Sequence, residues 1–156
     1  MDSLGILWQF KIVPKDLIIA LMYHVQGKQE KAKSYFQKTY DLTYPLLNQY
    51  PDDFRMHAVT GIALAGLDEK ERALREGAKA RDLMPVSKDA ILGTSPLESL
   101  ALIYTLNGDQ NKAVDILQQL LKMPFAWTMS NSIPLYRMHY YWKPLQNNQR
   151  FQQMIQ

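Results

Sequence analysis

Small residues recur along this chain at one fixed spacing, and this spacing limits its fold more than any other feature. In three places a small residue is followed twelve positions later by an alanine: Ala20 and Ala32, Gly61 and Ala73, Ala101 and Ala113. The alanines of successive pairs lie 41 and 40 residues apart. Two antiparallel helices approach closely only where side chains are small, so each pair is predicted to mark the contact within one helical hairpin. Three hairpins are expected to stack, because one hairpin alone cannot bury its apolar face.

Helix-end signals place these hairpins along the chain. Gly27 stands where a first helix would end, as a C-terminal glycine. Asp68 with Glu71, and Ser95 with Glu98, have the spacing of a capping box at the start of a helix. We therefore expect helix pairs at about 15–50, 53–84 and 95–122, followed by a C-terminal capping segment at about 123–156.

The first and third hairpins carry the pattern of a known family. In "ALMYHVQGKQEKAKSYF" and "LALIYTLNGDQNKAVDIL", an aromatic residue (Tyr23 or Tyr104) follows the small residue by three positions. A bulky residue (Phe36 or Leu117) follows the alanine by four. The pattern resembles the tetratricopeptide repeat, whose period is about 34 residues, so the connections here would be longer. The resemblance implies an all-α superhelix of about three antiparallel helix pairs plus the capping segment.

The C-terminal sequence narrows the resemblance. The ending "YYWKPLQNNQRFQQMIQ" is similar to the end of the repeat region in bacterial multidomain signalling proteins, where TolB-like, adenylate-cyclase-type, kinase or winged-helix modules precede the repeats. The matching positions are Trp142, Pro144, Leu145, Arg150, Phe151 and Ile155. The resemblance implies that residues 1–156 form a single repeat domain at the C-terminal end of a larger bacterial protein. It implies a scaffolding role and offers no catalytic residues.

Composition excludes several kinds of site and partner. The 18 Lys and Arg residues are interleaved with 15 Asp and Glu residues, so no basic patch indicates nucleic-acid binding. There is no cysteine, hence no disulfide and no thiolate ligand or nucleophile, which agrees with a reducing, cytoplasmic location. The apolar run 17–25 is about half of what a membrane helix needs, so we expect no membrane span and no export signal.

A search for chemistry predicts no enzyme. His24, His57 and His139 are too scattered for a local metal site, and no phosphate-binding loop or nucleophile motif occurs. Asp52 and Asp53 are better explained as helix N-caps than as an acid–base pair. The aromatic stretch "LYRMHYYWKPL" fits a terminal cap better than a base-stacking surface. We expect no catalytic, cofactor or metal site, although an enzyme built on a helical solenoid stays an alternative.

What remains is the concave face that the family resemblance implies. In tetratricopeptide arrays the first helix of each pair lines a groove, and the equivalent positions here are Leu17, Leu21, His24, Arg55, Ala58, Ile62, Glu98, Leu102 and Thr105. The groove would have an apolar floor, with Arg55 and Glu98 at its rim, and would bind a peptide or partner helix. For His24, a groove-facing or half-buried polar residue without a functional role is the favoured interpretation. The C-terminal segment or a neighbouring domain can also fill the groove.

Two functions therefore stay open: a non-catalytic protein-interaction scaffold, or a structural and regulatory tail that positions or dimerises an upstream signalling or DNA-binding domain. The partner's identity is not encoded in any motif, and both a homo-oligomer and an intramolecular contact with an upstream domain are compatible with the sequence. Trp8 and Phe10 in "LGILWQF" are compatible with an additional half-repeat. Gly61 and Ala73 are expected to form the seam of the central hairpin, with Gly77 and Ala80 leaving room for the next pair. Replacing Leu21, Ile62 and Leu102 together by Ser is expected to abolish binding without unfolding the chain.

Overall fold

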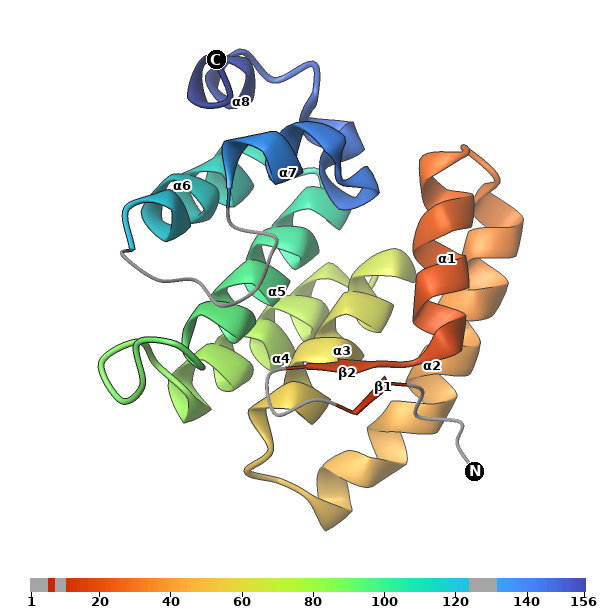
Figure 1. The fold of residues 1–156 in the computed structure, drawn as a ribbon. Helices are drawn as coiled ribbons and strands as arrows, with labels where there is room; N and C mark the ends of the chain where they lie inside the picture. Colours follow the sequence, from red (N-terminus) through yellow and green to blue (C-terminus); the bar gives the residue numbers. More distant parts are fainter. Residues whose placement is uncertain (1–5, 8–10, 124–131) are drawn as a thin grey trace.

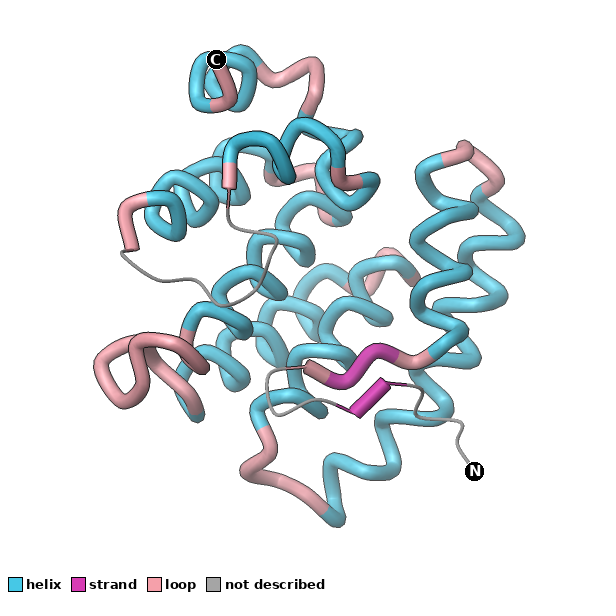
Figure 2. The backbone as a smooth tube through the Cα atoms, viewed as in Figure 1, coloured by secondary structure: helices cyan, strands magenta, loops and turns pink. Residues whose placement is uncertain are grey.

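The computed structural model describes residues 6–7, 11–123 and 132–156, and these residues are mostly helical (Figure 2). Three antiparallel hairpins succeed one another (Figure 1): α1 (Lys15–Val25) with α2 (Gln29–Gln49), α3 (Phe54–Gly66) with α4 (Lys70–Leu83), and α5 (Thr94–Leu106) with α6 (Gln110–Leu121). Shorter helices follow: α7 (Ile133–Met138), the 3-10 helix η1 (Tyr140–Leu145) and α8 (Gln149–Met154). The two-residue strands β1 (Ile6–Leu7) and β2 (Ile12–Val13) pair antiparallel before α1. The prediction of an all-α fold is confirmed.

All three hairpins turn with the same backbone geometry. The second residue after the first helix has a positive φ: +74° at Gly27, +65° at Asp68 and +80° at Gly108. The next amide donates to the carbonyl five residues earlier, in Lys28–Tyr23, Glu69–Leu64 and Asp109–Tyr104, at 2.9 to 3.0 Å. This is the Schellman arrangement that ends a helix through a left-handed residue. The repeat therefore extends from side-chain spacing to the backbone of the turns.

Both expected capping boxes are absent at the helix ends that the structure describes. Asp68 occupies the left-handed turn position, and Glu69 precedes α4 without a side-chain capping bond. The helix α5 begins at Thr94, so Ser95 lies inside it and Glu98 faces inward. Both predictions were wrong because the Schellman turn and the loop before α5 set these helix starts. The cap expected at Asp53 is confirmed, since its carboxylate accepts the Arg55 amide at 2.9 Å.

The small residues form the seams within and between hairpins, as predicted. Ala20, Ala32, Ala73, Ala101 and Ala113 are fully buried. A Cβ on Gly61 would lie 3.1 Å from the carbonyl oxygen of Ala73, so α3 and α4 meet there with no space for a side chain. A Cβ on Gly77 would lie 2.7 Å from Cδ1 of Ile103, which shows that α5 packs into the space left by this glycine. These contacts explain why the central hairpin has so little side-chain bulk.

The hairpins do not stack at equal spacing. Helix α3 packs on α5, and α2 and α4 pack on α3 and α5 respectively, so the second and third hairpins form a close pair. Helix α1 is set apart from α3 in Figure 1, which leaves a wedge where β2 packs on α3 and η1 packs between α1 and α5. The first hairpin is therefore joined to the rest through α2 and through these two short segments.

The C-terminal segment is part of the core. Trp142, Leu145 and Phe151 are completely buried, and η1 packs between α1 and α5 while α8 packs on α6. Arg150 pairs with Asp115 of α6 at 2.6 Å. The N-terminal half-repeat is not formed at 6–7, because these residues are a strand; Trp8 and Phe10 lie outside the described residues.

Candidate functional site

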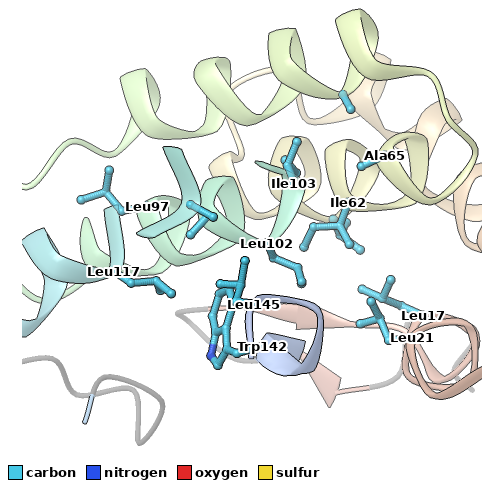
Figure 3. Packing of buried hydrophobic residues seen from close by; sticks show 14 of the residues in the cluster. Leu17, Leu21, Ile62, Ala65, Leu97, Leu102, Ile103, Leu117, Trp142 and Leu145 are labelled. Carbon is cyan, nitrogen blue, oxygen red and sulfur yellow. The ribbon is translucent and has the colours of Figure 1, made fainter. Parts of the chain in front are cut away.

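One pocket collects most of the positions predicted for the concave face. Seven of the nine line it: Leu17 and Leu21 from α1, Arg55, Ala58 and Ile62 from α3, and Glu98 and Leu102 from α5. Their common register on three different helices brings them to the same wedge, with Leu17 and Leu21 across the space from Ile62 (Figure 3). The sequence repeat thus locates the walls of a real pocket.

Two predicted positions lie elsewhere. The His24 ring packs edge-on against Phe36, with the ring centroids 6.4 Å apart, and burial lowers its pKa from the usual value. Thr105 is buried, and its hydroxyl donates to the carbonyl of Ala101 at 2.9 Å. Both residues are on the C-terminal turn of their helices, beyond the end of the pocket.

The pocket is narrow because the chain covers its own inner face. Tyr141 and Trp142 of η1 line one side, and Lys11, Ile12 and Val13 at β2 line the other. Trp142 and Leu145 lie against Leu102 in Figure 3. The remaining space measures about 40 Å³, which is far below the roughly 300–1,000 Å³ of a typical small-molecule site. The geometry suits side chains of a protein segment better than a metabolite.

The apolar residues that form the floor of the pocket also belong to the hydrophobic core. Leu21, Ile62 and Leu102 are all buried and belong to the main hydrophobic cluster. Truncating a buried leucine or isoleucine costs about 2–5 kcal/mol, and three such changes approach the whole stability of a small domain. A triple serine variant is therefore expected to lose its fold together with any binding, so it does not separate the two.

Glu98 is the principal charged group in the pocket. Its side chain is only 3% exposed, and Oε2 forms an ion pair and hydrogen bond with Nζ of Lys11, whose side chain is 25% exposed. Oε1 is buried without a hydrogen-bond partner among the described residues. Ser95 and Ser99 from the same helix also line the pocket. A buried carboxylate needs a cationic partner, because leaving it alone in an apolar site is costly.

Arg55 is fixed at the pocket edge by its own helix start. Asp53 accepts both the backbone amide of Arg55 and its guanidinium, with 2.6 Å between Nη2 and Oδ2. This contact raises the pKa of Arg55. Hydrogen bonds from Arg55 lower the pKa of Asp53 although burial opposes them. The N-cap therefore also positions the rim cation.

A second polar cluster was missed by sequence reasoning. Nδ1 of His57 lies 2.6 Å from Oε2 of Glu76, and Nε2 lies 2.9 Å from the carbonyl oxygen of Pro51. Two acceptors on the two ring nitrogens favour the imidazolium form. The hydrogen bond with Glu76 accordingly raises the pKa of His57, with burial opposing it. This cluster joins the α2–α3 turn to α4 and faces no part of the pocket.

The other pocket residues that sequence reasoning missed come from its two covers and from helix positions next to the predicted ones. Ile12 and Val13 form a β-branched pair directly before Pro14, a pattern typical of a short strand, and this was the available signal. Nothing in the sequence indicated that this strand would reach the inner face. The position of Trp142 followed in part from the expected alternative that the C-terminal segment fills the groove.

Several site types are missing from the described residues. Over 6–7, 11–123 and 132–156, no group of three or more His, Asp or Glu residues is placed to hold a metal ion. Among the helices in the same ranges, none has the length and apolar character to cross a membrane.

Comparison with known proteins gives no family. No protein-family model matches the chain, no curated protein matches it significantly, and no solved structure does so. The tetratricopeptide resemblance, and the role in a bacterial signalling protein that it implies, stay predictions.

Proposed function

We propose that this chain is a non-catalytic protein-interaction module that binds a peptide or partner helix at the inner face of α1, α3 and α5. The observation that supports the proposal is the convergence of equivalent register positions from three helices on one pocket. Its walls are apolar, and a single buried carboxylate lies among them. Apolar anchors are a common means by which a groove recognises a protein segment, and the charged side chains of Glu98 and Arg55 would fix its register. A tetratricopeptide-like superhelix, with an irregular first interval, is the architecture that fits this role.

A second candidate is the structural or regulatory tail. The observation that favours it is the coverage of the inner face by η1, which buries Trp142 and Leu145 completely. In this case the binding surface toward an upstream domain would lie elsewhere. The gene sequence upstream of this chain distinguishes the two candidates. A fused cyclase, kinase or winged-helix module encoded there would favour the structural or regulatory tail.

The proposed function is tested with a pocket-filling variant. The full chain is used to select binders from a random peptide library, and the affinities are measured by calorimetry. Ala58→Leu places three extra carbons into a pocket of about 40 Å³, so it is expected to weaken binding at least tenfold. Ala78→Leu on α4, outside the pocket, is the matched control and is expected to have no effect. Circular dichroism establishes that both variants are folded.

The affinities of the two variants distinguish binding at the inner face from the structural tail. Loss of affinity in Ala58→Leu alone supports binding at the inner face. Equal affinity of both variants, or a library that yields no binder, would refute it and leave the structural tail.

A further inference from the structure

The segment Lys11–Val13, which covers the pocket opposite η1, occupies the pocket as a bound peptide would. Lys11 and Ile12 lie across the inner face of α3 and α5, where Lys11 pairs with Glu98 and Ile12 is 5% exposed. A basic residue and an adjacent apolar anchor thus occupy the site that the proposed function assigns to a partner. The chain itself shows which chemistry the pocket accepts.

This cover is held more weakly than the other one. Among the residues that the structure describes, the two-residue strand β2 pairs with the two residues of β1 alone; a two-stranded ribbon of this kind is marginally stable in water. By contrast, η1 buries the indole of Trp142 completely, and the carbonyl of Pro144 accepts a bond from Gln110 of α6 at 3.1 Å. Of the two covers, the segment 11–13 is the one that a competitor can displace.

The charge of the site fixes the charge of the competitor. An acidic segment would bring a second anion beside the nearly buried Glu98, which is unfavourable in a low-dielectric site. A neutral segment would remove Lys11 and leave this carboxylate unpaired. A basic segment replaces the ion pair and leaves the site neutral. Apolar residues beside the basic one are required, because Ile12 contributes the apolar half of the contact.

Lys11 contacts only one of the two carboxylate oxygens of Glu98. Nζ of Lys11 contacts Oε2, while Oε1 has no hydrogen-bond partner among the residues that the structure describes. A guanidinium presents two parallel N–H donors that match both oxygens of a carboxylate. An arginine at this position would therefore satisfy an acceptor that the chain's own lysine leaves unpaired.

We infer that the segment Lys11–Val13 is an internal competitor, and that the partner is a protein segment with an arginine directly before a β-branched apolar residue. The inference rests on the proposed function. The tethered segment competes at an effective concentration of about millimolar order, so the free chain binds weakly. A partner binds in proportion to the fraction of molecules whose cover is displaced. The arginine supplies the advantage that a partner needs over the internal lysine.

The test uses the full chain and labelled eight-residue peptides. The probes have the sequence QFKIVPKD (residues 9–16), with Lys, Arg, norleucine or Glu at the position of Lys11. The proteins are the wild type, Lys11→Ser, and Ile12→Ala, which retains the ion pair in case loss of Lys11 prevents folding. Lys15→Ser, an exposed lysine at the start of α1 outside the pocket, is the matched control. Binding is measured by fluorescence anisotropy, and folding by circular dichroism.

We expect the two cover variants to bind the Arg peptide at least tenfold more tightly than the wild type or Lys15→Ser. The Arg peptide should bind about tenfold more tightly than the Lys peptide, since a satisfied buried charged group is worth at least that factor. The norleucine and Glu peptides should bind more weakly still. Adding Glu98→Gln to the cover variants should remove the preference for Arg.

Other results would overturn the inference. Equal binding of all four peptides, a preference that persists in Glu98→Gln, or no binding to folded cover variants would each do so. Dimers formed by strand exchange in place of peptide binding would make a second copy the occupant. If library binders still depend on Ala58 while these peptides fail, the inference falls alone; if both fail, the proposed function falls with it.

Discussion

The seam at Gly61 gives the sharpest test of the packing between α3 and α4. A Cβ added there would lie 2.9 Å from Cδ1 of Ile103, 3.1 Å from the carbonyl oxygen of Ala73 and 3.2 Å from the amide nitrogen of Gly77. The methyl group of Ile103 is the end of a flexible side chain and can move. The two backbone atoms belong to α4 and can move only if the helix shifts.

These distances separate two substitutions. Gly61→Ala is expected to be within about 1 kcal/mol of the wild type, because the helix propensity gained, about 1 kcal/mol, offsets a mild overpacking. Gly61→Leu adds three further carbons to a position with backbone on two sides. It is expected to destabilise the chain by about 3 kcal/mol, at the upper end of the range for overpacked cores.

The free energy of unfolding is measured by urea denaturation with circular dichroism at 222 nm. Lys79→Leu on the exposed face of α4 is the control, because it adds the same side chain without a seam. Combining Ile103→Val with Gly61→Leu should recover part of the loss, which shows coupling between the two positions. A Gly61→Leu variant as stable as the Lys79→Leu control would refute the contact between α3 and α4, and with it the twelve-residue rule.

Three further perturbations follow from the structure. Gly66→Ala would place a Cβ 2.3 Å from the buried ring of Phe36; we expect a loss of about 1–3 kcal/mol in urea denaturation, which Phe36→Leu reduces. Asp68→Gly should raise the free energy of unfolding by up to about 1 kcal/mol, because an L-residue with a φ of +65° is strained, and a lower free energy of unfolding in urea denaturation would contradict this. The folded pKa of His57 is raised above its unfolded value of about 6.5. The stability from its contact with Glu76 is therefore complete below about pH 6.5 and is lost as the pH rises through the folded pKa. Urea midpoints measured from pH 5 to 9 should show this decline, and Glu76→Gln should flatten it.

The predictable part of the fold is the part governed by local and repeated spacing. The seam residues followed from one steric rule, which needs only the sequence separation of two small side chains. The turn at Gly27 followed from the same kind of local rule, because glycine reaches a positive φ without strain. Asp68 was assigned wrongly, since its acidic side chain fits a cap and only its alignment with Gly27 and Gly108 indicates the turn.

The predictable part of the site is its walls, and the covers were not predictable. Leu21, Ile62 and Leu102 hold their places through helix periodicity, so a repeat alignment finds them. Lys11 reaches Glu98 across 87 positions of sequence, and no local spacing encodes such a contact. The contact depends on how far the first hairpin is displaced, which is a property of the whole stack.

That displacement also connects the departure from regular stacking to the proposed function. If α1 packed on α3 as α3 packs on α5, their apolar faces would close on each other and Glu98 would have no space in front of it. The wedge instead leaves these faces to be covered by an inserted segment, and burial of apolar surface favours one that fills it. The chain's own Lys11–Val13 enters because it is tethered nearby, although its lysine leaves one oxygen of Glu98 unpaired. The proposed exchange of this occupant for a better-matched segment would pair that oxygen, a gain that a fully satisfied core would not offer.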